Sequence, residues 1–155
     1  MPESHWTILT ARLKKGYRVA SGPSEAYPEY GSIEKQKPYF KELGLDLDHV
    51  FNGTLNISIE PYEFEMVNPQ YKFENVKWTE LTNAEDFSFS PCKIKFQGKK
   101  FDGWVYYPDP ETKKEHFQSK STIEVLAPLI EGIKYGDRLE LSLNSEELKV
   151  ISPIR

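Results

Sequence analysis

The sequence predicts a mainly β domain, a small barrel or sandwich with a helical insert. Short segments in which apolar and polar residues alternate recur along the chain, separated by turn residues. Aromatic residues make up 14% of the chain, mostly Tyr and Phe, which favour strands. A length of 155 residues suits one domain with one core. We therefore expect a single domain over 1–155.

The N-terminal region predicts strand and then loop. Residues 6–13 are the first predicted strand, and 17–20 continue it after a bulge or turn at Gly16. Residues 21–31 are rich in Gly, Pro, Ser and Tyr, which is typical of a long loop.

One main helix and one short helical turn are expected. The main helix is predicted at 33–43, with Pro38 in the first turn of its stronger half. Gly44 is placed to cap its C-terminus. A single helical turn is predicted at 128–133, beginning at Pro128.

The rest of the chain predicts strands separated by turns. Residues 67–86 are the least regular part and suggest an elaborated surface loop. The remaining predicted strands are 54–59, 62–66, 87–89, 93–97, 102–107, 121–126, 138–143 and 147–151.

The strand at 54–59 carries the most informative pattern. It follows Asn52-Gly53, a pair that supplies the positive φ angles of a tight turn. Alternation places Thr54 and Asn56 on the same face, opposite the apolar residues. A hydroxyl and an amide oxygen placed this way suit a hard cation such as Mg²⁺ or a polar ligand. On the pattern alone, a half-exposed strand with a polar face is the favoured explanation.

Composition excludes several classes of function. A net charge of −4 and a pI near 5.5 argue against broad binding of nucleic acid or of an anionic membrane. No apolar run is long enough to span a bilayer. The first residues lack the plan of a signal peptide, so we expect a cytoplasmic protein. Cys92 is the single cysteine, which predicts neither a disulfide nor a cysteine metal cluster.

Other candidate groups each have two interpretations. Asp46 and Asp48 share a face if their segment is extended, and they could then hold a metal. They could instead belong to a solvated loop, which is favoured because the full ligand spacing of a calcium loop is missing. His116 lies in a highly charged segment. It is either a ligand contact or acid–base group, or an exposed histidine without a functional role. Cys92 suits a packed apolar residue better than a nucleophile.

The order of several motifs resembles the CTP-dependent riboflavin kinases. The resemblance covers roughly Leu13 to Leu143 and implies a cradle-loop β-barrel. Gly-Thr-Leu-Asn and Ile-Glu-(apolar)₂-Ala-Pro, in this order, are its most specific parts. The motifs that carry it are Leu43-Gly44-Leu45, Gly53-Thr54-Leu55-Asn56, Ile123-Glu124-Val125-Leu126-Ala127-Pro128 and Tyr135-Gly136-Asp137-Arg138-Leu139-Glu140-Leu141.

The resemblance implies a metal site and a flavin site. The family holds Mg²⁺ with the Thr and Asn of Gly-Thr-Leu-Asn, which correspond to Thr54 and Asn56. The Glu before Ala-Pro contacts the flavin and corresponds to Glu124. The family's flavin-contacting threonine falls on His116 by an ungapped count, or on Thr112 with a shift. Since Glu124 shares a strand face with Thr122, we expect it to line the same cavity as Thr54 and Asn56.

The nucleotide side departs from the family pattern. The family's phosphate loop has glycines at alternate positions, which correspond here to Gly22, Ser24 and Ala26. Glu25 adds a negative charge there, which repels phosphate. The basic segment that follows Ala-Pro in the family is replaced by 129–132, which has no cation. We therefore expect flavin to bind more strongly than nucleotide, with weak or no turnover.

Three functions follow. The first is a riboflavin kinase-like phosphotransferase, which makes FMN from riboflavin and a nucleoside triphosphate, CTP in the family, with Mg²⁺. The second is a flavin-binding or small-molecule-binding module without catalysis. The third is a protein-interaction domain that uses exposed aromatic residues, for which the candidates are Tyr27, Tyr30, Tyr106 and Tyr107.

Overall fold

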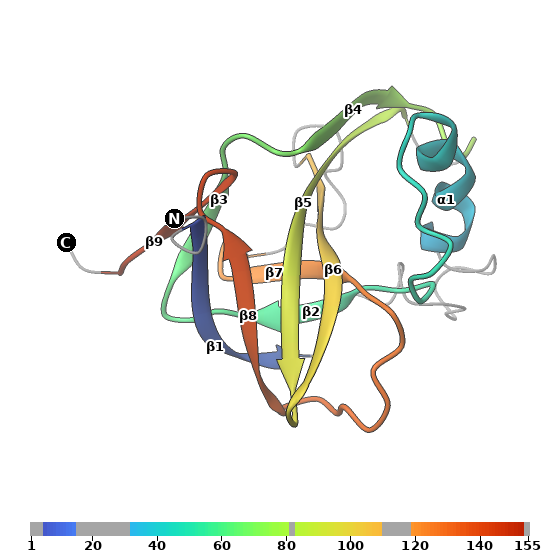
Figure 1. Ribbon diagram of the computed structural model, residues 1–155. Helices are drawn as coiled ribbons and strands as arrows, with labels where there is room; N and C mark the ends of the chain where they lie inside the picture. The colour runs from blue at the N-terminus through green and yellow to red at the C-terminus, as the bar shows by residue number, and fades with distance from the viewer. Residues whose placement is uncertain (1–4, 15–31, 81–82, 110–118, 154–155) are drawn as a thin grey trace.

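The computed structural model describes residues 5–14, 32–80, 83–109 and 119–153. The predicted strand at 17–20 and the loop at 21–31 lie outside these residues. Within them the fold is mainly β, as predicted (Figure 1). The elements are β1 (Trp6–Lys14), α1 (Ser32–Glu42), β2 (Leu55–Ser58), β3 (Glu63–Met66), β4 (Tyr71–Val76), β5 (Glu85–Phe96), β6 (Lys99–Pro108), β7 (Thr122–Leu126), β8 (Arg138–Asn144) and β9 (Leu148–Ile151).

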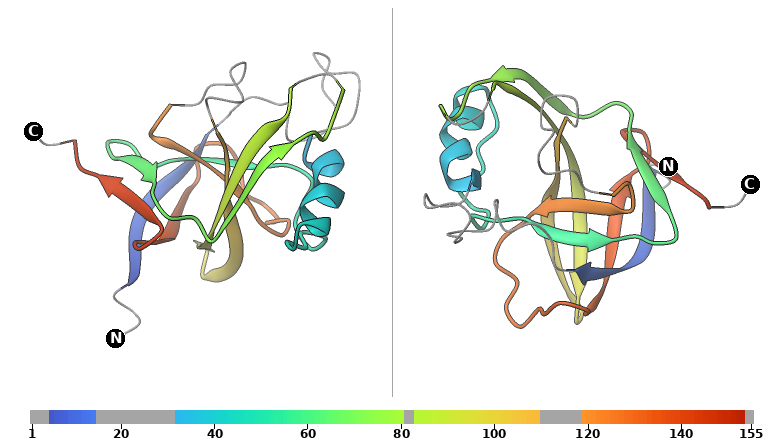
Figure 2. Two further views of the ribbon diagram at one scale, coloured as in Figure 1. Left: turned by 90° about the horizontal axis from the view of Figure 1, so that it is seen from above. Right: turned by 180° about the vertical axis from the view of Figure 1, so that it is seen from behind.

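The main sheet closes on itself. Its strands follow the order β4-β5-β6-β7-β2-β1-β8, and β8 also pairs with β5. Six strands therefore form a ring, and β4 extends from β5 outside it. A small second sheet pairs β3 with β9. Figures 1 and 2 show the ring from three directions, with α1 outside it, next to β4, β5 and β6.

Two apolar clusters lie on opposite faces of the ring. Alternation along each strand sends one set of side chains inward, where residues such as Ile57, Ile123 and Leu141 form the inner cluster. The other set faces outward, and part of it is covered by α1. There Phe40 packs edge-on against Phe87 and Phe89, at ring distances of 5.0 Å each. Polar side chains that face outward therefore lie beside the apolar cluster that α1 covers.

Helix α1 ends as its sequence predicts. Gly44 has a positive φ of 115°, and the Leu45 amide donates to the Phe40 carbonyl across 2.9 Å. This is the glycine-capped helix end expected from the sequence. The helix runs over Ser32–Glu42, within one residue of the predicted 33–43, and Pro38 lies in its interior and not in a first turn.

Strand β5 corrects the prediction of two strands at 87–89 and 93–97. It is continuous over Glu85–Phe96 and contains Pro91. Its pairing with β4 extends to Phe89, and its pairing with β8 begins at Cys92. Pro91 therefore lies where one edge of β5 changes partner, so its missing N–H removes no ladder hydrogen bond at that edge.

Two irregular segments also differ from their predictions. Residues 67–86 are not only a surface loop, since they contain β4 and the start of β5. Residues 128–133 contain turns and no helical turn. Gly132 has a φ of 85° there, a conformation incompatible with a right-handed helix.

The positive φ angles predicted at Asn52-Gly53 occur elsewhere. Neither of these residues has a positive φ, and the Gly53 amide donates to the Phe51 carbonyl across 2.8 Å. Gln97 and Gly98 do have positive φ angles, of 52° and 81°, and join β5 to β6. This is a two-residue hairpin turn in which both central residues are left-handed, and its twist matches the twist of the flanking strands.

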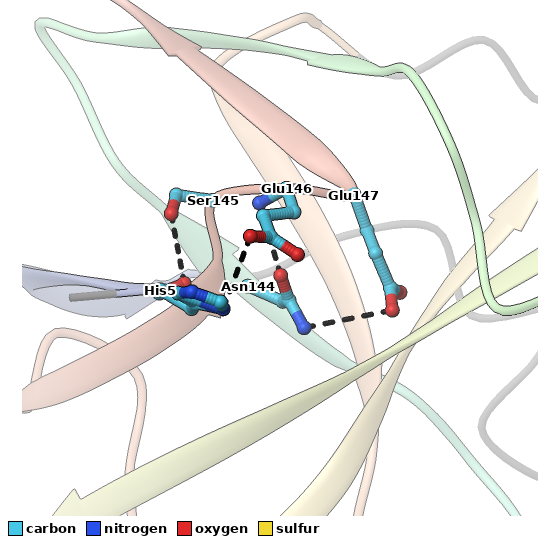
Figure 3. A network of polar contacts seen from close by, with 5 residues as sticks. All are labelled: His5, Asn144, Ser145, Glu146 and Glu147. Atoms are coloured by element: carbon cyan, nitrogen blue, oxygen red, sulfur yellow. Dashed lines mark hydrogen bonds and ion pairs between the residues drawn. The ribbon is translucent and has the colours of Figure 1, made fainter. Parts of the chain in front are cut away.

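A polar network joins the start of β1 to the turn between β8 and β9 (Figure 3). The Ser145 hydroxyl donates to the His5 carbonyl across 2.8 Å, and His5 Nδ1 lies 3.1 Å from Glu146 Oε2. Glu147 accepts from Asn144 and, across 2.7 Å, from the buried Ser90 hydroxyl. We call these residues the β8–β9 turn network.

Among the described residues, no helix qualifies as a membrane span. Helix α1 has 11 residues, too few to cross a bilayer.

Candidate functional site

Thr54, Asn56 and Glu124 meet on the outer face of the ring. Asn56 is paired with Glu124 across β2 and β7, so both side chains project from the same face. The Thr54 hydroxyl, just before β2, lies 3.3 Å from Glu124 Oε1 as donor to acceptor. Glu124 therefore lies beside Thr54 and Asn56 on one face of the sheet, as expected, and their common role in a site stays a prediction.

The hydrogen bond between Thr54 and Glu124 is a loose one. Its 3.3 Å separation exceeds the usual range of about 2.5–3.0 Å for a hydroxyl donor. Thr54 is 9% exposed and Asn56 is 7% exposed, so both lie in a nearly water-free setting. A ligand that competes for these oxygens therefore displaces a weak contact.

Lys14 and Thr122 extend the polar face on either side. Lys14 is paired with Asn56 across β1 and β2. Its ammonium donates to the Thr122 hydroxyl across 3.1 Å. A row of Lys14, Asn56 and Glu124 therefore crosses three neighbouring strands. We call these three residues, with Thr54 and Thr122, the polar face.

Tyr106 connects this face to helix α1. Its buried hydroxyl donates to Gln36 Oε1 across 2.8 Å. Burial raises the pKa of Tyr106, and the negative charges of Glu124 and Glu85 raise the pKa further, against the opposing effect of the Gln36 hydrogen bond. Tyr106 therefore stays a neutral donor, and the charge of Glu124 acts on it directly.

Two buried polar atoms beside the polar face lack a partner among the described residues. Asn52 Oδ1 belongs to the turn that leads into β2, and Gln36 Nε2 belongs to the residue that holds Tyr106. Buried polar groups are normally hydrogen-bonded, and leaving one unpaired costs about 1–3 kcal/mol. A polar ligand bound here would give these two atoms a hydrogen-bond partner.

The donor set of the polar face fits Mg²⁺. Thr54, Asn56 and Glu124 offer a hydroxyl, an amide and a carboxylate, and hard cations prefer oxygen ligands. Mg²⁺ commonly uses one or two carboxylates together with substrate phosphates. In the described part of the chain no three His, Cys, Asp or Glu side chains cluster to hold a metal. A site here would therefore rely on one carboxylate and on the ligand's oxygens.

The other candidates have structural explanations. Asp46 Oδ1 accepts from the Asp48 amide across 2.9 Å, and Asp48 Oδ2 lies 2.8 Å from Lys41 Nζ. The segment is therefore a hydrogen-bonded turn tied to α1. Cys92 is buried in the inner cluster, where burial raises the pKa of its thiol. It is packed as an apolar residue, as the sequence suggested.

Five predicted site residues lie outside the described residues. These are the nucleotide-loop residues Gly22, Ser24 and Ala26, and the flavin-contact candidates Thr112 and His116. The aromatic residues proposed for an interaction surface are partly corrected. Tyr106 is buried and Tyr107 is half-buried, so neither is an exposed contact.

Sequence reasoning missed Lys14, Tyr106 and Gln36 as neighbours of the site. Alternation would have put Arg12 and Lys14 on one face of the first strand. Nothing local indicates that this strand pairs with β2, because the two are far apart in the sequence.

Comparison of the chain with models of known protein families matched none of them, and comparison with curated proteins found no significant relative.

Proposed function

We propose that the protein is a riboflavin kinase-like phosphotransferase that binds flavin and Mg²⁺ at the polar face. The observation that carries the proposal is the meeting of Asn56 with Glu124. The two belong to separate motifs, 68 positions apart, and stand opposite each other across β2 and β7. The resemblance implies that the motif of Asn56 binds the metal and that the motif of Glu124 binds the flavin. Metal and flavin must be adjacent for phosphoryl transfer. We also propose that the closed ring is the cradle-loop barrel of that family.

The reaction demands positioning and charge neutralisation more than covalent catalysis. The terminal hydroxyl oxygen of riboflavin forms a bond to the γ-phosphorus, the bond to the bridging oxygen breaks, and the hydroxyl proton is lost. The products are FMN and the nucleoside diphosphate. Bound Mg²⁺ would supply positive charge against the phosphate oxygens.

The chain's own residues contribute orientation and a dry environment. Thr54 donates its hydrogen toward Glu124, which leaves the lone pairs of its oxygen for a cation. Glu124 would accept a hydrogen bond from the flavin, and Tyr106 and Gln36 hold the adjacent surface in place. Lys14, tied to Thr122, adds a positive charge beside Asn56.

A flavin-binding module without catalysis is the second candidate. It is favoured by the segment after Ala127, where the exposed residues Leu129 and Glu131 stand in place of the family's cations. A carboxylate there opposes a triphosphate. This candidate keeps the flavin contacts of Glu124 and loses the turnover.

The test is FMN formation from riboflavin with CTP or ATP and Mg²⁺, together with separate calorimetric titrations of each ligand. We expect riboflavin to bind more tightly than either nucleotide, and FMN formation to be slow. The Thr54→Ala and Asn56→Ala variants should abolish FMN formation. Lys149→Gln is the matched control, since Lys149 is exposed on β9, away from the polar face.

The outcomes separate the candidates. Riboflavin binding without FMN formation would support the binding module. FMN formation that persists in both Thr54→Ala and Asn56→Ala would rule out the proposed metal site. Absence of both flavin and nucleotide binding would contradict the proposed function altogether.

A further inference from the structure

We propose that an open pocket beside the polar face, between β1, β2 and β8, binds phosphate through Arg12 and Arg138. The pocket has a volume of about 400 Å³ and is lined by Thr10, Ala11, Arg12, Ser58, Glu60 and Arg138. The ligand class is an organic polyphosphate. Its identification as the donor nucleotide rests on the proposed function, whereas the affinity for phosphate does not.

Sheet register brings the two arginines together. Arg12 is paired with Ser58 on β2 and with Arg138 on β8, so all three side chains project from one face. Both arginines are exposed at the pocket. Arginine presents five donors in a planar fork that matches phosphate oxygens, which makes paired arginines a suitable phosphate cradle.

Arg12 is oriented by one hydrogen bond that leaves most of its N–H donors available. Its Nη1 donates to the Gly136 carbonyl across 3.2 Å. The Gly136 amide in turn donates to the Leu13 carbonyl across 2.7 Å, which fixes this loop against β1. One guanidinium hydrogen bond orients the side chain, and its other N–H groups remain for a ligand.

Arg138 has no comparable structural task. Among the described residues its guanidinium forms no hydrogen bond or ion pair, although Asp137 beside it accepts from the Lys134 amide across 2.9 Å. Glu60 lines the same pocket and offsets one positive charge. The balance of two arginines against one glutamate still favours an anion.

The pocket and the polar face form one continuous surface. Ser58 lines the pocket, and Asn56 is the next residue of β2 on the same face, about 7 Å away at the strand rise. Lys14 bridges the two, since it follows Arg12 on the same face of β1 and is paired with Asn56. A phosphate chain lying along these strands would therefore meet Arg138, Arg12 and Lys14 in turn. These cations would supply the positive charge that the segment after Ala127 lacks.

The test is calorimetric titration of tripolyphosphate, CTP, cytidine and orthophosphate into the full chain. Arg12→Gln and Arg138→Gln are compared with Lys149→Gln, which removes the same charge from β9. We expect each arginine variant to weaken tripolyphosphate and CTP binding about 10-fold, and Lys149→Gln to leave both unchanged. Arg138→Lys should recover part of the loss. Added salt should weaken binding in the wild type.

The arms of the experiment separate the sources of the phosphate. Tighter binding of CTP than of tripolyphosphate, with no binding of cytidine, supports the nucleotide as the ligand. Equal binding of tripolyphosphate and CTP supports the pocket as a polyphosphate site. Unchanged binding in both arginine variants, or no binding of any phosphate by the wild type, overturns the proposal. Phosphate binding without riboflavin binding would sustain the pocket and refute the proposed function.

Discussion

The polar face and the β8–β9 turn network differ in what their side chains do for the fold. In the turn network, the hydrogen bonds close the turn between β8 and β9 or tie it to other segments, as where the Ser145 hydroxyl donates to the His5 carbonyl (Figure 3). The polar face lies on β1, β2 and β7, which the backbone ladder already holds together. Among the described residues, the hydrogen bonds from Thr54 to Glu124 and from Lys14 to Thr122 join segments that the sheet already holds together and close no turn.

The difference separates structural polar residues from candidate functional ones. In the turn network, Glu147 pairs its carboxylate with Ser90 and Asn144 and so has partners for both oxygens. Beside the polar face, Asn52 Oδ1 and Gln36 Nε2 are buried without a partner among the described residues. Polar atoms that have no partner are available to a ligand, whereas the carboxylate of Glu147 is already engaged, so the polar face is the better candidate for binding. The two regions should therefore respond differently to substitution.

The largest effect is expected from Glu124→Gln, which keeps the shape of the side chain and removes its charge. A hydrogen bond to a charged group contributes about 1.5–3 kcal/mol, so riboflavin affinity should fall roughly 10-fold to 100-fold. The free energy of unfolding should change little, because Glu124 is half-buried and β7 keeps its ladder. Fluorescence titration of riboflavin and urea denaturation measure the two quantities. A large loss of stability with unchanged affinity would give Glu124 a structural role.

The opposite pattern is expected from Glu147→Ala. The substitution leaves the Ser90 hydroxyl, 1% exposed, without its acceptor. An unsatisfied buried group costs about 1–3 kcal/mol, and urea denaturation should show a loss of that size. Riboflavin and CTP affinities should stay at wild-type values. A fall in affinity as large as that of Glu124→Gln would remove the distinction between the two regions.

The sequence predicted the faces of the strands better than their partners. Alternation correctly put Thr54 with Asn56 and Thr122 with Glu124, because strand period is a local property. Nothing in the sequence indicated that Asn56 pairs with Glu124, because the register between distant strands is not encoded locally, and only a shared cavity was expected.

Three misses have physical reasons. Pro91 suggested a break between two strands, but the exchange of partners along β5 accommodates it. Arg12 and Arg138 gave no joint signal, because they meet only when β1 pairs with β8. Asn52-Gly53 resembles a hairpin turn, yet it bends without positive φ angles on its way into β2.

Alkaline pH should expose the link between the polar face and α1. Burial raises the pKa of Tyr106 in the folded chain, so the unfolded chain loses this proton first. Stability is therefore constant below the ordinary tyrosine pKa of about 10 and falls as pH rises above it, by up to about 1.4 kcal/mol per pH unit. Urea denaturation between pH 8 and 11 measures this slope, and Tyr106→Phe should reduce it. An unchanged slope in Tyr106→Phe would place the titration in other groups.

The smallest effect is expected from His5→Ala. Its imidazole lies 3.1 Å from Glu146, but the two side chains are 45% and 63% exposed. Exposed ion pairs contribute about 0–1 kcal/mol. The bond from Ser145 goes to the His5 backbone and survives the substitution. Thermal denaturation should therefore show at most a small loss of stability. A loss as large as that of Glu147→Ala would contradict this ranking.

The most direct test of the central claim is an amide-resolved NMR titration of the chain with riboflavin, with and without Mg²⁺. Both regions are observed in one experiment, so each is the control for the other. We expect chemical-shift changes at residues 53–58 and 122–126, and none at 144–148. Shifts concentrated at 144–148, or no shifts at 53–58 and 122–126 at saturating riboflavin, would contradict the assignment of the polar face as the flavin and metal site.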